Sequence, residues 1–323
     1  MAASRNKPSS NLPACLAAFL AARVPPTQTL CVGLSGGRDS VVLAHALIGA
    51  GFLPRLSALH VHHGLSPHAD AWAVHCRQLC EHWGLPLAIV RVEVDTTAGL
   101  GLEAAARHAR YARFAEVAAD CVLLAHHQDD QAETMLFNLL RGSGVAGAKG
   151  MPVERMVGDK HLLRPLLSVP AVDIRAYAEA EGLSWVEDES NADTTFSRNY
   201  LRREVMPVLQ ARFPQAAAQL ARAAGHFAEA ERLLGELGGQ DWLACAAGDG
   251  ATVVALRQLS ASRLRNLLRW RLHVLGWRAP DAARLDEFVR QLLMAGPEGR
   301  PCLALPDGEM RVHRGRLLFV APA

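Results

Sequence analysis

The chain has 323 residues, of which 50% are hydrophobic, enough for a sizeable core and for two domains. It has no run of about 18 uninterrupted apolar residues, and residues 1–8 lack the apolar segment of a signal peptide. We therefore expect no membrane span, no export and a cytoplasmic location. The cysteines are scattered, without a Cys-x-x-Cys pair, which argues against a disulfide framework, an iron–sulfur cluster or a zinc ribbon.

The charge is unevenly divided along the chain. Residues 1–197 carry 16 Lys and Arg against 20 Asp and Glu, a net charge of −4, whereas residues 198–323 carry 18 against 12, a net charge of +6. A basic C-terminal part indicates a polyanionic substrate, because attraction to phosphates supplies much of the affinity of such partners. An ordinary solvated, arginine-rich surface is the alternative.

Residues 30–40 combine a short apolar run with a glycine turn and a helix start. This geometry binds phosphates, because glycines let the backbone approach an anion and the first amides of a helix point at it. A Walker loop would need Lys after its last glycine, but Gly37 is followed by Arg38 and Asp39. The segment instead resembles the Ser-Gly-Gly-x-Asp-Ser signature of the PP-loop ATP pyrophosphatases. The predicted phosphate-binding residues are Ser35, Gly36, Gly37, Arg38, Asp39 and Ser40; a plain turn without a ligand is the alternative.

Apolar segments alternate with helical patterns in the first two thirds of the chain. The expected strands cover residues 30–34, 56–61, 87–92 and 121–125, and the expected helices cover residues 11–23, 40–50, 69–83, 102–119 and 130–140. This alternation predicts an α/β fold with a parallel, doubly wound sheet. The loops after its strands should meet in one crevice.

We expect two domains, a catalytic ATP-binding domain over residues 1–214 and a basic, mainly helical domain over residues 215–323. The second begins with an alanine-rich helix over residues 215–236 that bridges the two. It continues with a basic amphipathic helix over residues 262–278 and ends in a β-element over residues 301–320.

Acidic residues follow the fourth expected strand. Asp130 and Glu133 are three residues apart on the expected helix and therefore share one of its faces. Beside a phosphate loop they could hold a metal ion, bind a cationic substrate or accept a proton; a helix cap is the alternative for Asp130. We reject a zinc site among the histidines at 60, 62, 63, 68 and 75, because no Cys or Asp at a matching spacing completes it.

Two further segments carry candidate functional residues. Arg107 either pairs with Glu103 on a helix surface or balances charge that develops on a phosphate. Residues 141–152 contain four glycines and are expected to form a mobile loop, either a plain connector or a cover over the substrate.

Taken in order, these motifs resemble those of the tRNA(Ile)-lysidine synthases. After Ser-Gly-Gly-x-Asp-Ser come His-x-His-Gly-Leu, Gly-x-Glu-x-x-x-Arg-x-x-Arg-Tyr, His-His-x-Asp-Asp-Gln-x-Glu-Thr, Arg-Gly-Ser-Gly and Asp-x-Ser-Asn with Arg-Asn-x-x-Arg. The resemblance is strong over residues 28–207 and general beyond residue 215. It implies an adenine nucleotide α-hydrolase-like PP-loop fold. The family's further C-terminal tRNA-gripping domain is not expected, because the chain is too short for it.

The resemblance also implies a reaction in two steps. The C2 carbonyl oxygen of the wobble cytidine in a CAU anticodon attacks the α-phosphorus of ATP, and the amine of free L-lysine then displaces AMP to give lysidine. The implied catalytic residues are Asp39, Arg107, Asp130, Glu133 and Arg202, with Arg203 as a less favoured substitute for Arg202. Asp130 and Glu133 would hold lysine, Arg107 and Arg202 would steady phosphate charge, and Asp39 and Asp130 would bind Mg²⁺.

The implied partners are tRNA(Ile) with a CAU anticodon, free L-lysine and, as an open alternative to a monomer, a second copy of the chain in a homodimer. Two other functions stay open. A PP-loop tRNA thiolase shares the ATP chemistry, although the absence of a Cys-x-x-Cys pair counts against it. A catalytically inactive nucleotide- or RNA-binding module would retain Asp39, Asp130 and Glu133 without using them.

Overall fold

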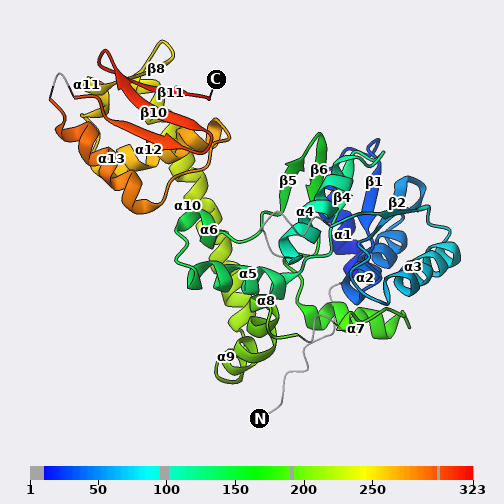
Figure 1. The fold of residues 1–323 in the computed structure, drawn as a ribbon. Helices are drawn as coiled ribbons and strands as arrows, with labels where there is room; N and C mark the ends of the chain where they lie inside the picture. Colours follow the sequence, from blue (N-terminus) through cyan, green and yellow to red (C-terminus); the bar gives the residue numbers. More distant parts are fainter. Residues whose placement is uncertain (1–10, 95–101, 190–192, 297–298, 323) are drawn as a thin grey trace. The chain divides into compact units, whose positions relative to one another are not determined.

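The computed structural model describes residues 11–94, 102–189, 193–296 and 299–322, and it describes no side chain for Leu102 and Glu103. The chain divides into two compact units, Met1–Phe227 and Ala228–Ala323 (Figure 1). This division falls within one long helix, α10 (Ala216–Cys245). The domain boundary at 214/215 remains a prediction, and each unit is described by itself below.

The first unit is built on a six-stranded sheet with the strand order β3-β2-β1-β4-β6-β5. All neighbouring strands are parallel except β5 and β6, which form an antiparallel hairpin at one edge (Figure 1). The strands are β1 (Leu30–Gly33), β2 (Leu56–His62), β3 (Leu87–Arg91), β4 (Cys121–Leu123), β5 (Glu154–Val157) and β6 (Lys160–Leu163). The predicted parallel sheet is confirmed, and the edge hairpin is an addition.

Helices cover both faces of this sheet, as the doubly wound prediction requires. Alternate strand residues point to opposite faces, so Leu30 and Val32 pack in one core with Leu16 and Val41, while Val122 belongs to a second core. The first face is covered by α1 (Leu12–Ala21), α2 (Arg38–Gly49), α3 (Ala69–Trp83) and α7 (Ala171–Ala180). The second face is covered by α4 (Leu102–Ala115), which contributes Phe114.

A helical layer follows the sheet in the same unit. It contains α5 (Gln128–Leu140), α6 (Val145–Ala148), α8 (Ser197–Tyr200), a π-helical turn η3 (Leu201–Val205) and α9 (Met206–Arg212). Ala132 of α5, Met206 of α9 and Ala217 of α10 form a small core that holds these helices together. The π-helical turn carries Arg202, and such turns occur frequently at functional sites.

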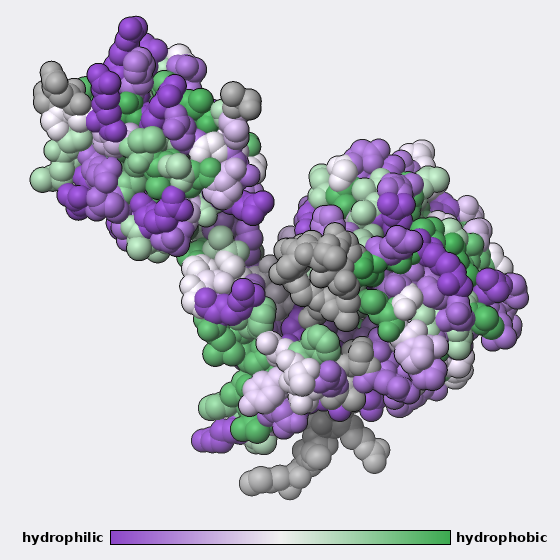
Figure 2. Space-filling model, in the orientation of Figure 1, coloured by the Kyte–Doolittle hydropathy of each residue, from purple (hydrophilic) through white to green (hydrophobic). Residues whose placement is uncertain are grey.

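The second unit combines helices with an antiparallel sheet of strand order β7-β8-β11-β10-β9. Leu264 and Leu268 of α12 pack against Phe288 of α13 and Met310 of β10 in its core. Hydrophilic residues are spread over its visible face, with smaller hydrophobic areas between them (Figure 2). The elements are β7 (Ala246–Ala247), β8 (Gly250–Thr252), α11 (Val253–Leu256), α12 (Ala261–Val274), α13 (Ala282–Met294), β9 (Cys302–Leu305), β10 (Gly308–His313) and β11 (Arg316–Val320).

The terminal β-element and the basic helix predicted for this part of the chain are both present. Two arginines of α12 are engaged within the unit, because Arg263 pairs with the buried Asp241 and Arg265 pairs with Asp286 at 3.2 Å. Among the described residues, no helix combines the length and the apolar character needed to cross a bilayer.

Candidate active site

The loop after β1 is held by hydrogen bonds between its own polar groups. Ser40 Oγ accepts from the amide of Ser35 at 3.2 Å and donates to the carbonyl of Gly37 at 2.8 Å, and Ser35 Oγ accepts from the amide of Gly37 at 3.3 Å. Gly37 is the N-cap of α2, so the loop ends at the amino terminus of a helix. This terminus favours an anion, because its free amides and the helix dipole both carry positive charge.

Gly36 satisfies a conformational and a steric requirement of this loop. Its φ is +88°, a region that residues with a Cβ rarely adopt. A Cβ at this position would also lie 3.0 Å from Val186 Cγ2 and 3.1 Å from Cys76 Sγ. The backbone carbonyl of Gly36 accepts from the amide of Val186 at 3.0 Å. The loop is therefore packed closely against residues that are distant in sequence.

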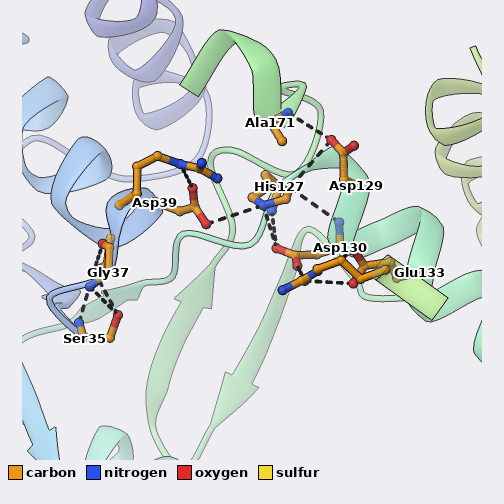
Figure 3. A network of polar contacts seen from close by, with 11 residues as sticks. Ser35, Gly37, Asp39, His127, Asp129, Asp130, Glu133 and Ala171 are labelled. Carbon is orange, nitrogen blue, oxygen red and sulfur yellow. Dashed lines mark hydrogen bonds and ion pairs between the residues drawn. The ribbon is translucent and has the colours of Figure 1, made fainter. Parts of the chain in front are cut away.

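His127 connects this loop to the acidic residues of α5 (Figure 3). Its Nε2 lies 3.5 Å from Asp39 Oδ2 and 3.5 Å from Asp130 Oδ2. His127 is only 6% exposed. Burial by itself would lower the pKa of His127, but contact with Asp39 and Asp130 outweighs it and raises that pKa. The His127 ring thus lies between two carboxylates that would otherwise repel each other.

The same histidine begins α5 through a capping box. The amide of Asp130 donates to His127 Nδ1 at 3.5 Å, and the amide of His127 donates to Asp130 Oδ2 at 3.1 Å. The neighbouring Asp129 accepts from the amide of Ala171 at 2.9 Å, at the start of α7, and its Oδ2 also lies 3.8 Å from His127 Nδ1. Asp130 therefore has the predicted capping contact and also faces Asp39, whereas Asp129 joins two helices.

Arg202 spans the two acidic residues that share a face of α5. It donates from Nε to Glu133 Oε1 at 2.8 Å, from Nη2 to Glu133 Oε2 at 2.8 Å and from Nη2 to Asp130 Oδ1 at 2.7 Å. Glu133 is 3% exposed, and its burial raises the pKa of the carboxyl although Arg202 partly opposes this. The paired fork is the strong, bidentate form of an arginine–carboxylate contact.

The electrostatics of Asp39 differ from those of Glu133. Burial would raise the pKa of Asp39, but contact with His127 and Arg38 outweighs burial and lowers it. The Nε of Arg38 donates to Asp39 Oδ1 at 3.0 Å. Asp39 is thus a stable carboxylate at the phosphate loop, while Glu133 is the more basic of these two acids.

The structure thus brings Asp39, Asp130, Glu133 and Arg202 into one connected network, but it gives Arg107 a different partner. Arg107 Nη2 donates to the hydroxyl of Tyr111 at 3.4 Å, one turn further along α4. The side chain of Glu103, the alternative partner of Arg107, lies outside the described residues, as do Ser190 and Asn191 of the Asp-x-Ser-Asn motif.

The glycine-rich segment 141–152, predicted as a mobile loop, includes the short helix α6 and is attached to α5 at two points. The side chain of Asn138 donates to the carbonyl of Gly147 at 2.8 Å. The amide group of Gln131 pairs with the backbone of Met151, donating to its carbonyl at 3.0 Å and accepting from its N–H at 2.7 Å. These bonds hold the segment beside the acidic residues.

The sequence pattern alone predicts no separate role for His127 or Arg164. His127 belongs to the His-His-x-Asp-Asp-Gln-x-Glu-Thr motif, and its position after a strand and before two aspartates is the signal for a role in the site. Arg164 interrupts the apolar run of residues 162–167 and is 1% exposed. A single arginine inside an apolar segment signals a buried polar contact, because burying its charge without partners is costly.

Two protein-family models match the chain. A model of the PP-loop domain matches residues 9–209, and a model of the TilS substrate binding domain matches residues 252–318. The chain is 48% identical over 297 residues to a tRNA(Ile)-lysidine synthase of Alkalilimnicola ehrlichii, which covers 90% of this chain and 66% of that relative. It is 47% identical over 306 residues to the tRNA(Ile)-lysidine synthase of Pseudomonas aeruginosa, covering 90% and 68%. The chain spans about two thirds of the length of these curated relatives.

Among solved structures, the chain is similar to the U34-tRNA thiolase NcsA of Methanococcus maripaludis, which was determined with its iron–sulfur cluster. The TM-score is 0.57 at 18% sequence identity, and the match covers 68% of this chain and 78% of that one. At this identity the likeness shows the fold alone.

Proposed function

Because the chain belongs to the tRNA(Ile)-lysidine synthase family, we propose that it is an ATP-dependent ligase that converts the wobble cytidine of tRNA(Ile) to lysidine. The observation that carries this proposal is the contact of Asp39 and Asp130 with one imidazole, His127. It joins the phosphate loop to the acidic group, as a reaction between a nucleotide triphosphate and a cationic amino acid requires.

In the first step, the C2 carbonyl oxygen of the cytidine attacks the α-phosphorus of ATP, and the bond from that phosphorus to the bridging oxygen breaks to release pyrophosphate. Residues 35–40 would hold the phosphates at the amino terminus of α2, and the hydrogen bonds within the loop support this by fixing its shape. Arg107 and Arg202 would balance the charge that develops on the phosphates.

In the second step, the ε-amine of lysine attacks C2 and the C2–O bond breaks to release AMP. Asp130 and Glu133 would bind the lysine ammonium in exchange for contacts that they now make with Arg202. Only the neutral amine is nucleophilic, so one acid must accept a proton. The raised pKa of Glu133 favours it as this base, because a proton acceptor acts best when its pKa lies close to the working pH.

The residues at this site fit a magnesium ion. Mg²⁺ is usually bound by one or two carboxylates together with substrate phosphates, and Asp39 and Asp130 supply two carboxylates beside the phosphate loop. Within the described residues there is no group of three or more His, Cys, Asp or Glu side chains that could hold a metal by themselves. A bound Mg²⁺ would neutralise phosphate charge, while His127 keeps the two carboxylates together without it.

The second unit would bind the tRNA, as its match to a substrate binding domain supports. We place the protein in the cytoplasm, because that is where its proposed substrates meet. A homodimer remains a prediction, which analytical ultracentrifugation tests. The names of the curated relatives favour neither the thiolase nor the inactive module.

Incubation with ATP, radiolabelled lysine and a panel of tRNAs that carry a CAU anticodon tests the substrate assignment. We expect label in tRNA(Ile) alone and none in the methionine tRNAs. Sulfur-dependent consumption of ATP in place of lysine incorporation would point to the thiolase, and the absence of AMP formation would point to the inactive module.

A further inference from the structure

Three arginines surround Tyr111, outside the loop of residues 35–40. Arg107 and Arg164 donate to its hydroxyl at 3.4 and 3.3 Å. The guanidinium groups of Arg155 and Arg107 lie over its ring, 4.5 and 5.2 Å from the centroid. These four residues, here named the Tyr111 cluster, come from α4, from β5 and from the end of β6.

Among the residues whose side chains the structure describes, none balances the positive charge of this cluster through an ion pair. Throughout the described segments of the chain, no carboxylate forms an ion pair with Arg107, Arg155 or Arg164. The three charges act on the phenol, because they lower the pKa of Tyr111 even though its burial would raise that pKa. Like charges held together without a counter-ion raise the free energy of the folded protein, and such an arrangement is typical of an anion site.

Arg164 gives a second indication of a missing partner. It is 1% exposed and donates to the carbonyl of Pro152 at 2.6 Å, but its Nε is buried without a hydrogen-bond partner. The Nδ1 of His126 is also buried without a partner, in the field of both Arg164 and Arg107. Buried polar atoms are nearly always hydrogen-bonded, so the unsatisfied donor Nε of Arg164 beside a cationic cluster calls for an acceptor.

We propose that the Tyr111 cluster is a second anion site, which binds a phosphate group of a substrate. The proposal rests on the proposed function, whose nucleotide and RNA substrates both carry phosphates. The half-buried Arg107 and the exposed Arg155 would contact the phosphate with their planar forks. The buried Arg164 would add positive charge behind them. The Tyr111 hydroxyl would orient the guanidinium groups of Arg107 and Arg164.

Binding measurements on the full chain test this site with two variants and one control. Arg155→Gln removes an exposed charge, and Tyr111→Phe removes one oxygen while keeping the ring. Lys160→Gln is the matched control, because it removes a positive charge from the same β5–β6 hairpin near its turn. The probes are inorganic pyrophosphate, ATP and a transcript of tRNA(Ile) with a CAU anticodon, and thermal midpoints verify folding.

We expect each of the two variants to bind at least one probe about tenfold more weakly than wild type, with an unchanged thermal midpoint. Lys160→Gln should bind all three probes with wild-type affinity. A loss confined to ATP and pyrophosphate identifies a nucleotide phosphate. A loss of affinity confined to the transcript identifies a phosphate of the RNA backbone. In that case the slope of log affinity against log salt concentration should fall by about one phosphate contact.

Affinities within twofold of wild type for all three probes in both folded variants would overturn the anion site. Failure of the proposed function is distinguishable from this result. A wild-type chain that binds neither ATP nor the transcript would contradict the proposed function, while loss of pyrophosphate affinity in the variants would still support the site.

Discussion

Asp39 and Asp130 each place a carboxylate oxygen 3.5 Å from the same atom, Nε2 of His127. The two aspartates are 91 positions apart in sequence, and they meet because β1 and β4 are neighbours in the sheet and the loops after both strands lie at the same edge. The contact therefore follows from the topology of the sheet.

Replacing His127 should separate its structural role from its electrostatic one. His127→Asn retains a side chain that can cap α5 but removes the imidazole Nε2 that lies between Asp39 and Asp130. We expect lysine incorporation to fall about 10- to 100-fold, which is the usual effect of removing a residue that orients the groups of a site. Thermal stability should change little. His127→Ala should in addition cost about 1 kcal/mol of stability through the lost cap. Wild-type activity in a folded His127→Asn variant would contradict the bridging role.

Substitution of Asp130 tests the lysine site. Asp130→Asn removes the charge that would attract the ammonium group, so the KM for lysine should rise at least about tenfold while ATP is still bound. Asp129→Asn is the matched control, because asparagine keeps an oxygen acceptor for the amide of Ala171. Steady-state kinetics with varied lysine measure both variants. If Asp130→Asn leaves lysine incorporation unchanged, the lysine-site assignment is wrong.

The Arg202–Glu133 pair makes a prediction about stability. Arg202→Met leaves the buried carboxylate of Glu133 without its bidentate partner, which should cost about 1–3 kcal/mol in the free energy of unfolding. Glu133→Gln in the same chain removes that charge and should restore part of the loss. Urea denaturation of the single and double variants measures the coupling, and strictly additive effects would show that the pair does not stabilise the fold.

Two glycines with similar backbone angles give a controlled test of the phosphate loop. Gly36 and Gly51 have φ of +88° and +85°, but only at Gly36 would a Cβ meet neighbouring atoms. Gly51→Ala should therefore cost only the backbone strain, about 1–2 kcal/mol, and leave ATP affinity intact. Gly36→Ala should destabilise more and weaken ATP binding. Equal ATP affinity in the two variants would contradict the role of Gly36 in the loop.

Much of the first unit could be predicted because its signals are local. The apolar run of β1, the glycine turn and the start of α2 stand next to each other in sequence, so the phosphate loop was visible without a structure. The β5–β6 hairpin was not, because its strands have four residues each and β5 is mostly exposed. A short exposed strand shows almost no alternation of apolar and polar residues, so the sequence gives little signal for it.

The site was partly predictable for a similar reason. The shared face of Asp130 and Glu133 follows from helical spacing, but the partners of these residues do not. Arg202 reaches them from a π-helical turn 69 positions beyond Glu133, and His127, after β4, reaches Asp39, after the neighbouring strand β1. Such contacts arise from tertiary packing, and the spacing of residues along one helix or strand does not predict them.

The most direct test of the central claim is a single time course that counts pyrophosphate, AMP and tRNA-bound lysine in the same reaction. The account predicts that wild type forms all three in equal amounts, that Asp39→Asn forms none of them at an appreciable rate, and that Asp130→Asn releases pyrophosphate but transfers little lysine. Incorporation of lysine without matching release of AMP, or full lysine transfer by Asp130→Asn, would contradict a shared site for the nucleotide and the amino acid.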